Sequence, residues 1–218
     1  MIDVHPPTEP IHGWRDFFLH LTTITIGLLI ALGLEGCVSW QHHRHLVHEA
    51  EASLRVEIQS NADGLANVQA SVHQEQASLR QDVDVLKQMM RDPKMKSDNR
   101  LEISFHIAGF DNVSWKTAQS TGALSYMPYT RAQEYSAIYG LQDDLDSAQK
   151  QAARDAVVSI GSIVSVLADE PGDLPPTQQQ LQSGRQVIEV LQGQLRLVDS
   201  ELTALNTQYK KFLDAHPA

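Results

Sequence analysis

Histidines are the side chains of this sequence that could most readily do chemistry, and four of them follow its one long apolar stretch. They are His42, His43, His45 and His48. On a helix, His42, His45 and His48 would step by three residues, so that neighbouring pairs of rings could share a divalent ion such as zinc or nickel. Glu49 or Glu51 could complete the ligand shell.

The same histidines have a second interpretation. A tight metal site needs partners that hold each imidazole in place, and a solvated helix beside a membrane offers few of them. The rings would then form a polar, weakly basic collar at the level of lipid headgroups. A pH-dependent contact with the membrane lies between the two interpretations.

Recognisable enzyme parts are missing from the sequence. It has no Gly-rich phosphate loop, no G-x-S-x-G, no H-E-x-x-H and no C-x-x-C. The acidic run at residues 143–146 contains one apolar position and is typical of a solvated helix face. A di-iron bundle would need its acids on buried seams, and the seams predicted below are almost wholly apolar. We therefore expect neither catalysis nor a cofactor.

The apolar stretch at residues 17–34, FFLHLTTITIGLLIALGL, contains no Asp, Glu, Lys or Arg. As a helix it would be about 27 Å long, close to the hydrocarbon thickness of a bilayer. Trp14 and Trp40 bracket it, at the places where amphipathic rings prefer to lie. The stretch exceeds a signal-peptide core and no cleavage site follows, so we predict an uncleaved signal anchor at residues 17–40, after a tail at residues 1–16.

A lipoprotein signal is the alternative, because Leu-Glu-Gly-Cys at residues 34–37 resembles a lipobox. Such motifs require a small or apolar residue where Glu35 stands, which favours the permanent anchor. Cys37 is the only cysteine, so an intramolecular disulfide is excluded. Two interpretations of Cys37 stay open. One is a disulfide between two copies of the chain, and the simpler one is an unreactive thiol.

One face of the predicted anchor carries small residues four apart, ending in an acid: Thr23, Gly27, Ala31 and Glu35. Small residues at this spacing let two membrane helices approach closely, and a carboxyl can hydrogen-bond across the pair. We therefore expect the anchor to self-associate through this face. Alternatively, Glu35 simply reaches the interface, where an acid costs less than at the bilayer centre.

The net charge of the chain restricts the kinds of molecule that it is expected to bind. The formal net charge of −10 argues against nucleic acid or anionic lipid as a partner of the C-terminal domain. The basic residues near the anchor, Arg15 before it and Arg44 and Arg55 after it, are too evenly placed to set its orientation. Because a short tail before such an anchor usually stays inside, we expect a bacterial inner membrane with the C-terminal domain outside.

The domain predicted at residues 41–218 begins with a long helix at residues 41–91. No Pro interrupts that helix, and Asp92-Pro93 ends it. Its apolar residues recur at helical spacing, and the members of one set stand seven apart, as in a coiled coil. This set is Leu65, Val72, Leu79 and Leu86; the others are Leu46, Ala50, Leu54, Ile58, Val68, Val83 and Met90.

Two further helices are expected at residues 130–168 and 177–213, with capping boxes that start at Thr130 and Thr177. The apolar stripe of the first is Tyr135, Ile138, Leu145, Ala148, Ala152, Ala156, Ile160, Ile163 and Leu167. That of the second alternates steps of three and four: Ile188, Leu191, Leu195, Val198, Leu202, Leu205, Tyr209 and Phe212. The predicted fold is all-α, a transmembrane helix followed by an antiparallel bundle of long coiled-coil-like helices.

The connector at residues 94–127 departs from the helical pattern. Residues 101–107 alternate apolar and polar, which is typical of a half-buried strand or an irregular extended segment. A short helix follows, with Trp115, Ala118 and Gly122 near one side. We expect Trp115 to be a buried anchor that plugs the bundle, and Ala118 and Gly122 to permit a close backbone approach.

The span GLLIALGLE, the His/Arg-rich stretch at residues 42–45 and the element W-x-x-A-x-x-x-G-A-L at residues 115–124 together resemble a group of uncharacterised single-pass bacterial membrane proteins. The resemblance covers about residues 14–55 and 115–142. It implies a bacterial source and a helical extramembrane domain, and it brings no activity and no functional residues.

Two functions fit these features. One is a membrane-anchored interaction or scaffold module that self-associates or binds another membrane protein. The other is a ligand- or metal-responsive sensory subunit. Such a sensor would need a second membrane protein for its output, because the predicted tail is too short to fold. In either case the expected partners are the lipid bilayer and a second copy or another membrane protein.

Overall fold

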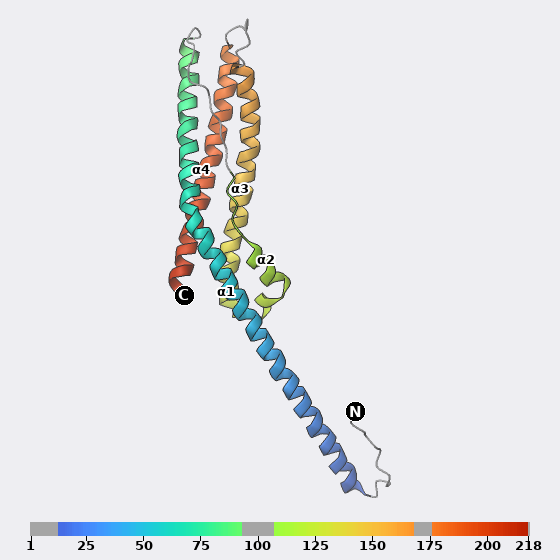
Figure 1. The fold of residues 1–218 in the computed structure, drawn as a ribbon. Coiled ribbons are helices and arrows are strands. Elements are labelled where there is room, and N and C mark those ends of the chain that lie inside the picture. The colour runs from blue at the N-terminus through green and yellow to red at the C-terminus, as the bar shows by residue number, and fades with distance from the viewer. Residues whose placement is uncertain (1–12, 93–106, 168–175, 218) are drawn as a thin grey trace. The chain divides into compact units, whose positions relative to one another are not determined.

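The computed structural model describes residues 13–92, 107–167 and 176–217, and every regular element within them is helical. The elements are α1 (Trp14–Arg91), α2 (Val113–Ser120), the 3₁₀ helix η1 (Ala123–Tyr126), α3 (Tyr129–Leu167) and α4 (Gln178–Ala215) (Figure 1). The predicted all-α fold is confirmed. The alternating segment lies outside the described residues except for Ile107, which is not helical. Contacts divide the chain into two units, Met1–Glu49 and Ala50–Ala218, which are described in turn.

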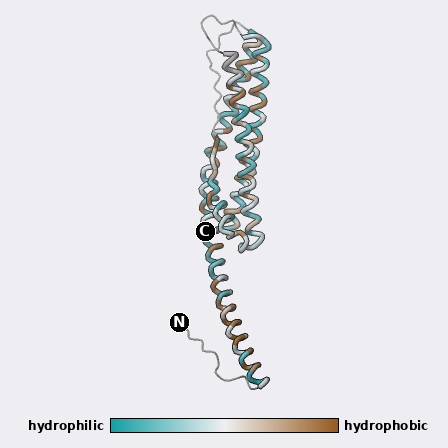
Figure 2. Tube along the Cα trace, turned by 90° about the vertical axis from the view of Figure 1, so that its right-hand side faces the viewer, coloured by the Kyte–Doolittle hydropathy of each residue, from teal (hydrophilic) through white to brown (hydrophobic). Residues whose placement is uncertain are grey.

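The first unit contains the N-terminal part of α1. We predicted one helix at residues 17–40 and another from residue 41, but α1 is continuous from Trp14 to Arg91, because no proline interrupts it. Its most apolar window of 18 residues has a mean hydropathy of 2.1, and none of that window is buried in the structure. The brown stretch of the tube in Figure 2 marks these residues. Among the described residues this is the one helix long and apolar enough to cross a membrane.

The second unit is a bundle of the remainder of α1 with α3 and α4. α4 runs antiparallel to α1, since Gln178 bonds to Met90 and Gln76 to Leu195. It also runs antiparallel to α3. The rings of Phe212 and Tyr135 lie 5.2 Å apart, and Tyr209, earlier on α4, accepts from Gln142, later on α3. The expected antiparallel packing thus holds for α4 against both neighbours (Figure 1).

α1 and α3 run in the same direction. Glu51 of α1 pairs with Arg131 of α3, and Glu57, further along α1, bonds to Tyr139, further along α3. Residues 107–128 lie against α1 and α3 at the end of the bundle where α3 begins (Figure 1).

The buried face of α4 follows an uninterrupted alternation of three and four residues. Every apolar position predicted for this seam is buried, and the pattern extends two turns further towards the N-terminus, to Gly184 and Leu181. Burying a leucine side chain contributes about 1.5–3 kcal/mol, so the seam is a main source of the bundle's stability. The predicted capping box at Thr177 is also confirmed: Gln180 N donates to Thr177 Oγ1, and the Gln180 side chain accepts from Thr177 N.

The buried faces of α1 and α3 follow the same heptad spacing, but polar residues interrupt them. On α1, all but Val68 of these positions are buried: Ile58, Asn61, Leu65, Val68, Val72, Glu75, Leu79, Asp82, Leu86 and Met89. On α3 they are Tyr135, Ile138, Gln142, Leu145, Gln149, Ala152, Ala156 and Ser159. The prediction that these seams are almost wholly apolar was wrong.

Smaller predictions also need correction. Ile160 was placed on the buried stripe of α3 but is 41% exposed, because the heptad continues through Ser159, which is 0% exposed. For the same reason Met89 is buried and Met90 only partly so. α3 begins at Tyr129, and Pro128 O accepts the first helical bonds, so the helix does not start with a cap at Thr130. The side chains of Ile163 and Leu167 lie outside the described part.

Candidate functional site

Several polar residues of the bundle core lie where the connector meets α1 and α3. Glu57 of α1 is the charged one among them, and both of its carboxylate oxygens accept hydrogen bonds. The other buried acids of α1, Glu75 and Asp82, lie further along the helix. Oε1 of Glu57 accepts a hydrogen bond of 2.6 Å from the Tyr139 hydroxyl, and Oε2 accepts one of 2.7 Å from Ser114 N. Ser114 is the second residue of α2, whose own N-cap residue, Asn112, makes no side-chain cap bond. Glu57 therefore caps α2 from a neighbouring helix.

Two amide side chains hold the connector backbone ahead of α2. Asn61 of α1 accepts from Asp111 N at 2.9 Å and donates to Asp111 O at 2.8 Å. Gln149 of α3 binds Ala108 in the same way, with distances of 2.7 Å to its N and 3.3 Å to its O. Each amide thus takes the place that a neighbouring strand would have in a sheet. Side chains of two helices thus bond the connector backbone at Ala108, Asp111 and Ser114.

Trp115 continues this attachment. Its ring is stacked on that of Tyr139, with the centroids 4.9 Å apart and the planes 5° from parallel. Ala118, one turn later, is buried. Trp115 was predicted to be buried but is half-buried, so the stacking on Tyr139, and not full burial, attaches it to the bundle. Gly122 has a different role from the one predicted. A Cβ there would meet nothing within 4 Å, and glycine is favoured because φ is +76° where α2 passes into η1.

Burial keeps the tyrosines of this cluster neutral. Burial, together with the hydrogen bond to Glu57, raises the pKa of Tyr139 well above its ordinary value. Burial raises the pKa of Tyr209 to about 12, although hydrogen bonding with Gln142 and Asn61 lowers it. Burial raises the pKa of Tyr135 to about 12, with a further contribution from Glu51. At neutral pH these hydroxyls are suited to hydrogen bonding and not to attack on a substrate.

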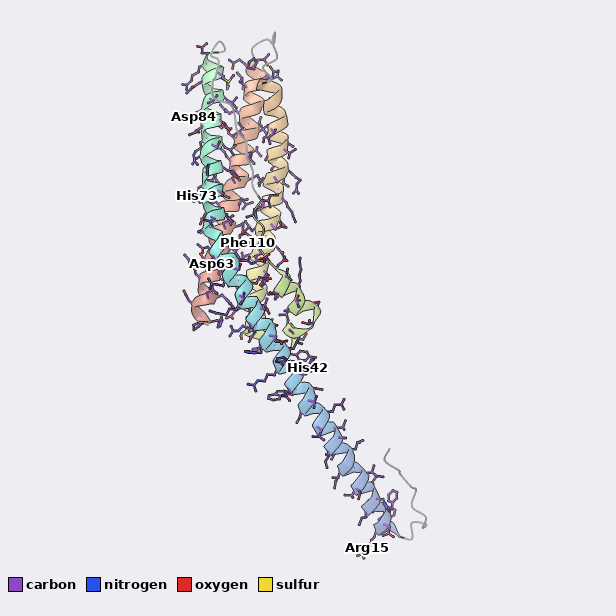
Figure 3. All side chains as sticks on the ribbon, in the orientation of Figure 1. Arg15, His42, Asp63, His73, Asp84 and Phe110 are labelled. Atoms are coloured by element: carbon purple, nitrogen blue, oxygen red, sulfur yellow. The ribbon has the colours of Figure 1, made fainter. Side chains whose placement is uncertain are left out.

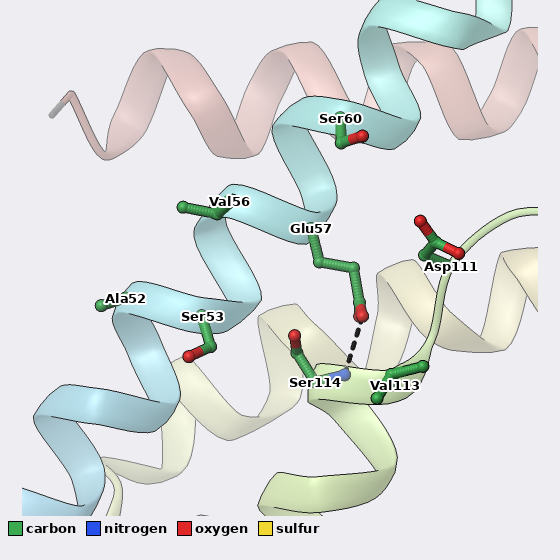
Figure 4. A pocket seen from close by; sticks show the side chains of 8 residues that line it. All are labelled: Ala52, Ser53, Val56, Glu57, Ser60, Asp111, Val113 and Ser114. Carbon is green, nitrogen blue, oxygen red and sulfur yellow. Dashed lines mark hydrogen bonds between the residues drawn. The ribbon is translucent and has the colours of Figure 1, made fainter.

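A surface pocket of about 610 Å³ lies beside the Glu57–Ser114 hydrogen bond (Figure 4). One wall comes from α1, including Ala52, Val56 and Glu57, and the other from Asp111, Val113 and Ser114. Val56 and Val113 are 70% and 68% exposed. Each wall of the pocket thus has an exposed valine and a carboxyl group, Val56 and Glu57 on one side and Val113 and Asp111 on the other.

The predicted packing face of the anchor lies in the first unit. Thr23, Gly27, Ala31 and Glu35 are all exposed in the single chain. Thr23 Oγ1 donates to Leu19 O at 2.9 Å, so this hydroxyl is satisfied within its own helix. A Cβ added at Gly27 would meet nothing within 4 Å. The face is therefore free of intramolecular contacts at that position.

Trp14 and Trp40, the two predicted interface anchors, each contact aromatic or cationic side chains. Trp14 contacts the rings of Phe17 and Phe18, at 6.2 and 5.0 Å between centroids. Trp40 has the guanidinium carbon of Arg44 5.4 Å from its ring centroid. Arg15 and His42, which are labelled in Figure 3, lie next to these tryptophans at the two ends of the apolar stretch.

The structure does not bring His42, His45 and His48 together. His45 Nε2 lies 3.1 Å from Glu49 Oε1, and the other two are exposed. In the described ranges no group of three or more His, Cys, Asp or Glu side chains could hold a metal ion. The physical reason is the helix itself, because steps of three residues turn each successive ring by about 60° around its axis.

Sequence reasoning missed the residues that hold the connector, above all Glu57, Asn61 and Gln149. A signal was present for two of them: Asn61 and Gln149 fall in register with the apolar heptads of α1 and α3. A polar residue at such a position is expected to be buried and partnered. Glu57 lies outside that register, and only the fold reveals its role.

The fold and the site define an all-α protein in which a helix apolar enough to cross a membrane continues into a heptad-packed bundle. Comparisons with protein-family models, with curated proteins and with solved structures found no match to this chain.

Proposed function

We propose that this protein is a single-pass membrane-anchored interaction module that self-associates through its anchor. The observation that carries the proposal is the window of α1 with a mean hydropathy of 2.1 and no buried residue. Each large apolar side chain exposed in this way would cost about 1.5–3 kcal/mol in water, and a lipid bilayer removes that cost. Trp14 and Trp40 at its ends suit the two interfaces.

Sodium carbonate extraction of cell membranes tests the anchor, because an integral protein stays in the pellet. For the orientation we propose that the bundle lies outside a bacterial inner membrane. A Cys37→Ser/Val190→Cys variant places the single thiol on an exposed position of α4. A membrane-impermeant maleimide should label it in intact spheroplasts. Labelling only after lysis would reverse the orientation.

Self-association should depend on the face of Thr23, Gly27, Ala31 and Glu35. Oxidation in membranes is expected to yield a dimer bridged through Cys37, two residues past the end of that face. Gly27→Leu should suppress the dimer, because the side chain keeps the backbones apart. Gly33→Leu is the matched control, since Gly33 also has open space around it but lies on another face. Equal crosslinking in both variants would contradict the proposed face.

The interaction role of the bundle rests on the pocket beside Glu57, with exposed Val56 and Val113 on its walls. Exposed apolar side chains around a pocket are typical of a binding surface. The same pocket supports the second candidate, a ligand-responsive sensory subunit that acts through another membrane protein. A ligand there would touch both α1 and the connector held by Glu57. The proposed function does not include catalysis.

A further inference from the structure

The stretch of α1 after the apolar window has the opposite charge to the rest of the chain. Residues 36–48 contain Arg44 and four histidines but no Asp or Glu, in a protein of net charge −10. The next acid, Glu49, lies 3.1 Å from His45 Nε2. Residues 40–48, which we call the collar, therefore contain no carboxylate that would repel an anionic partner.

Arg44 is the fixed positive charge of the collar, and Trp40 positions it. The guanidinium carbon lies 5.4 Å from the Trp40 ring centroid, within the range of a cation–π contact. Both side chains are exposed. In the part of the chain that the structure describes, Arg44 has no ion pair, whereas Arg131 and Arg185 each have a carboxylate partner. The stacked guanidinium thus keeps its N–H groups available for a ligand.

The spacing of these two residues matches the layers of a membrane surface. Tryptophan rings lie at the boundary between hydrocarbon and headgroups. Arg44 is one helical turn, about 6 Å, closer to water, which is the direction in which the phosphates of the lipids lie. The planar fork of a guanidinium binds phosphate oxygens in pairs.

We propose that Trp40 and Arg44 form a binding site for the phosphate group of anionic phospholipids. The inference rests on the proposed membrane anchor and adds a lipid class to it. The acidic bundle does not take part, so the preference for anionic lipid belongs to the collar alone. A membrane supplies this phosphate at the depth of Arg44, which is why a lipid headgroup fits better than phosphate in solution.

Electron spin resonance on the full-length protein in phosphatidylcholine vesicles can measure the preference. Traces of spin-labelled phosphatidylglycerol or phosphatidylcholine report how strongly each lipid associates with the protein. We expect phosphatidylglycerol to be favoured about fivefold, the contribution of one basic residue at a membrane surface. Arg44→Gln should bring the ratio close to one, and Trp40→Leu should lower it partway. Arg80→Gln, which removes an exposed arginine of the bundle, should leave it unchanged.

Each other outcome would overturn the inference in a distinguishable way. An unchanged ratio in Arg44→Gln would remove the site while leaving the anchor intact. If the lipid ratio of the original protein is close to one, while inorganic phosphate binds the protein and Arg44→Gln abolishes that binding, the collar binds free phosphate and not lipid. If no lipid of either kind is motionally restricted, the anchor itself is refuted and the lipid site with it.

Discussion

Tyr139 of α3 donates a hydrogen bond of 2.6 Å to Oε1 of Glu57 on α1, and so joins two parallel helices inside the bundle. The other oxygen of Glu57 accepts from Ser114 N, and the ring of Trp115 is stacked on that of Tyr139. One carboxylate and one phenol thereby fix where α2 lies against the bundle.

Removal of the Glu57 carboxylate should destabilise the bundle more than removal of an exposed acid. Glu57→Ala leaves the buried Tyr139 hydroxyl and Ser114 N without their acceptor, at an expected loss of about 3 kcal/mol in the free energy of unfolding. Glu57→Gln keeps one acceptor oxygen and should lose less. Urea unfolding followed by circular dichroism measures both, with Asp143→Ala on the exposed face of α3 as control. Equal effects for Glu57→Ala and Asp143→Ala would contradict the role of Glu57.

Asn61→Leu should loosen the connector at Asp111 much more than it destabilises the bundle as a whole. Leucine fits a heptad position and Asp111 is exposed to water, so the free energy of unfolding is expected to fall by only about 1 kcal/mol, less than in Glu57→Ala. The Asp111 amide, however, loses its acceptor, and its hydrogen exchange should accelerate about tenfold. Exchange read by NMR at Asp111 checks this. Gln69→Leu is the control, because the Gln69 amide bonds only to the side chains of Asp199 and Thr203. If Asp111 exchanges at its original rate in Asn61→Leu, the amide does not hold the connector.

An acidic side chain should affect stability very differently at two leucines of α4 that are two residues apart. Leu195 is 1% exposed and Leu197 is 47% exposed. Leu195→Asp places an unpaired carboxylate in the apolar seam and should unfold the bundle. Leu197→Asp should keep its melting temperature within a few degrees of that of the original protein. A thermal melt followed by circular dichroism compares them. A stable Leu195→Asp variant would show that this seam is not buried in solution.

High pH should unfold the bundle through its buried tyrosines. The pKa values of Tyr139, Tyr135 and Tyr209 are raised in the folded protein. In the unfolded chain these phenols lose their protons near about pH 10, so the unfolded state binds fewer protons above that pH. Stability is therefore fully present below about pH 10 and falls as the pH rises towards about 12, by about 1.4 kcal/mol per pH unit for each tyrosine.

Tyr139→Phe provides the comparison for this alkaline effect. It removes one of the three phenols, so the decline of stability above about pH 10 should become less steep by one proton. Lysine and arginine contribute equally in both proteins and cancel in the difference. Urea unfolding at a series of alkaline pH values gives both slopes. Identical slopes would mean that Tyr139 does not keep its proton in the folded bundle.

Salt bridges at the surface are not expected to matter in these experiments. His73 of α1, labelled in Figure 3, pairs with Asp199 of α4 at 3.0 Å. Lys87 pairs with Asp84 at 3.1 Å on α1 itself. Pairs that are this exposed contribute about 0–1 kcal/mol. The polar cluster around Glu57 differs because it is buried.

The sequence by itself determined the elements whose patterns are local. The apolar window of α1 is recognisable because a membrane span needs only a run of apolar residues. The seam of α4, from Ile188 to Phe212, is recognisable because every one of its heptad positions is apolar. The cap at Thr177 depends on residues three apart in the chain. In each case the information lies within a few turns of one helix.

Only the tertiary structure decided how the connector is held and which direction α3 takes beside α1. Glu57 contacts Ser114 and Tyr139, and Gln149 contacts Ala108, across separations of 41 to 82 residues. No periodicity encodes such pairs. Polar residues in a helical sequence look the same whether they face water or a buried backbone, because the difference lies in the partner. The free energy of burying Glu57 is favourable only where the connector supplies a donor, and that meeting is a property of the fold.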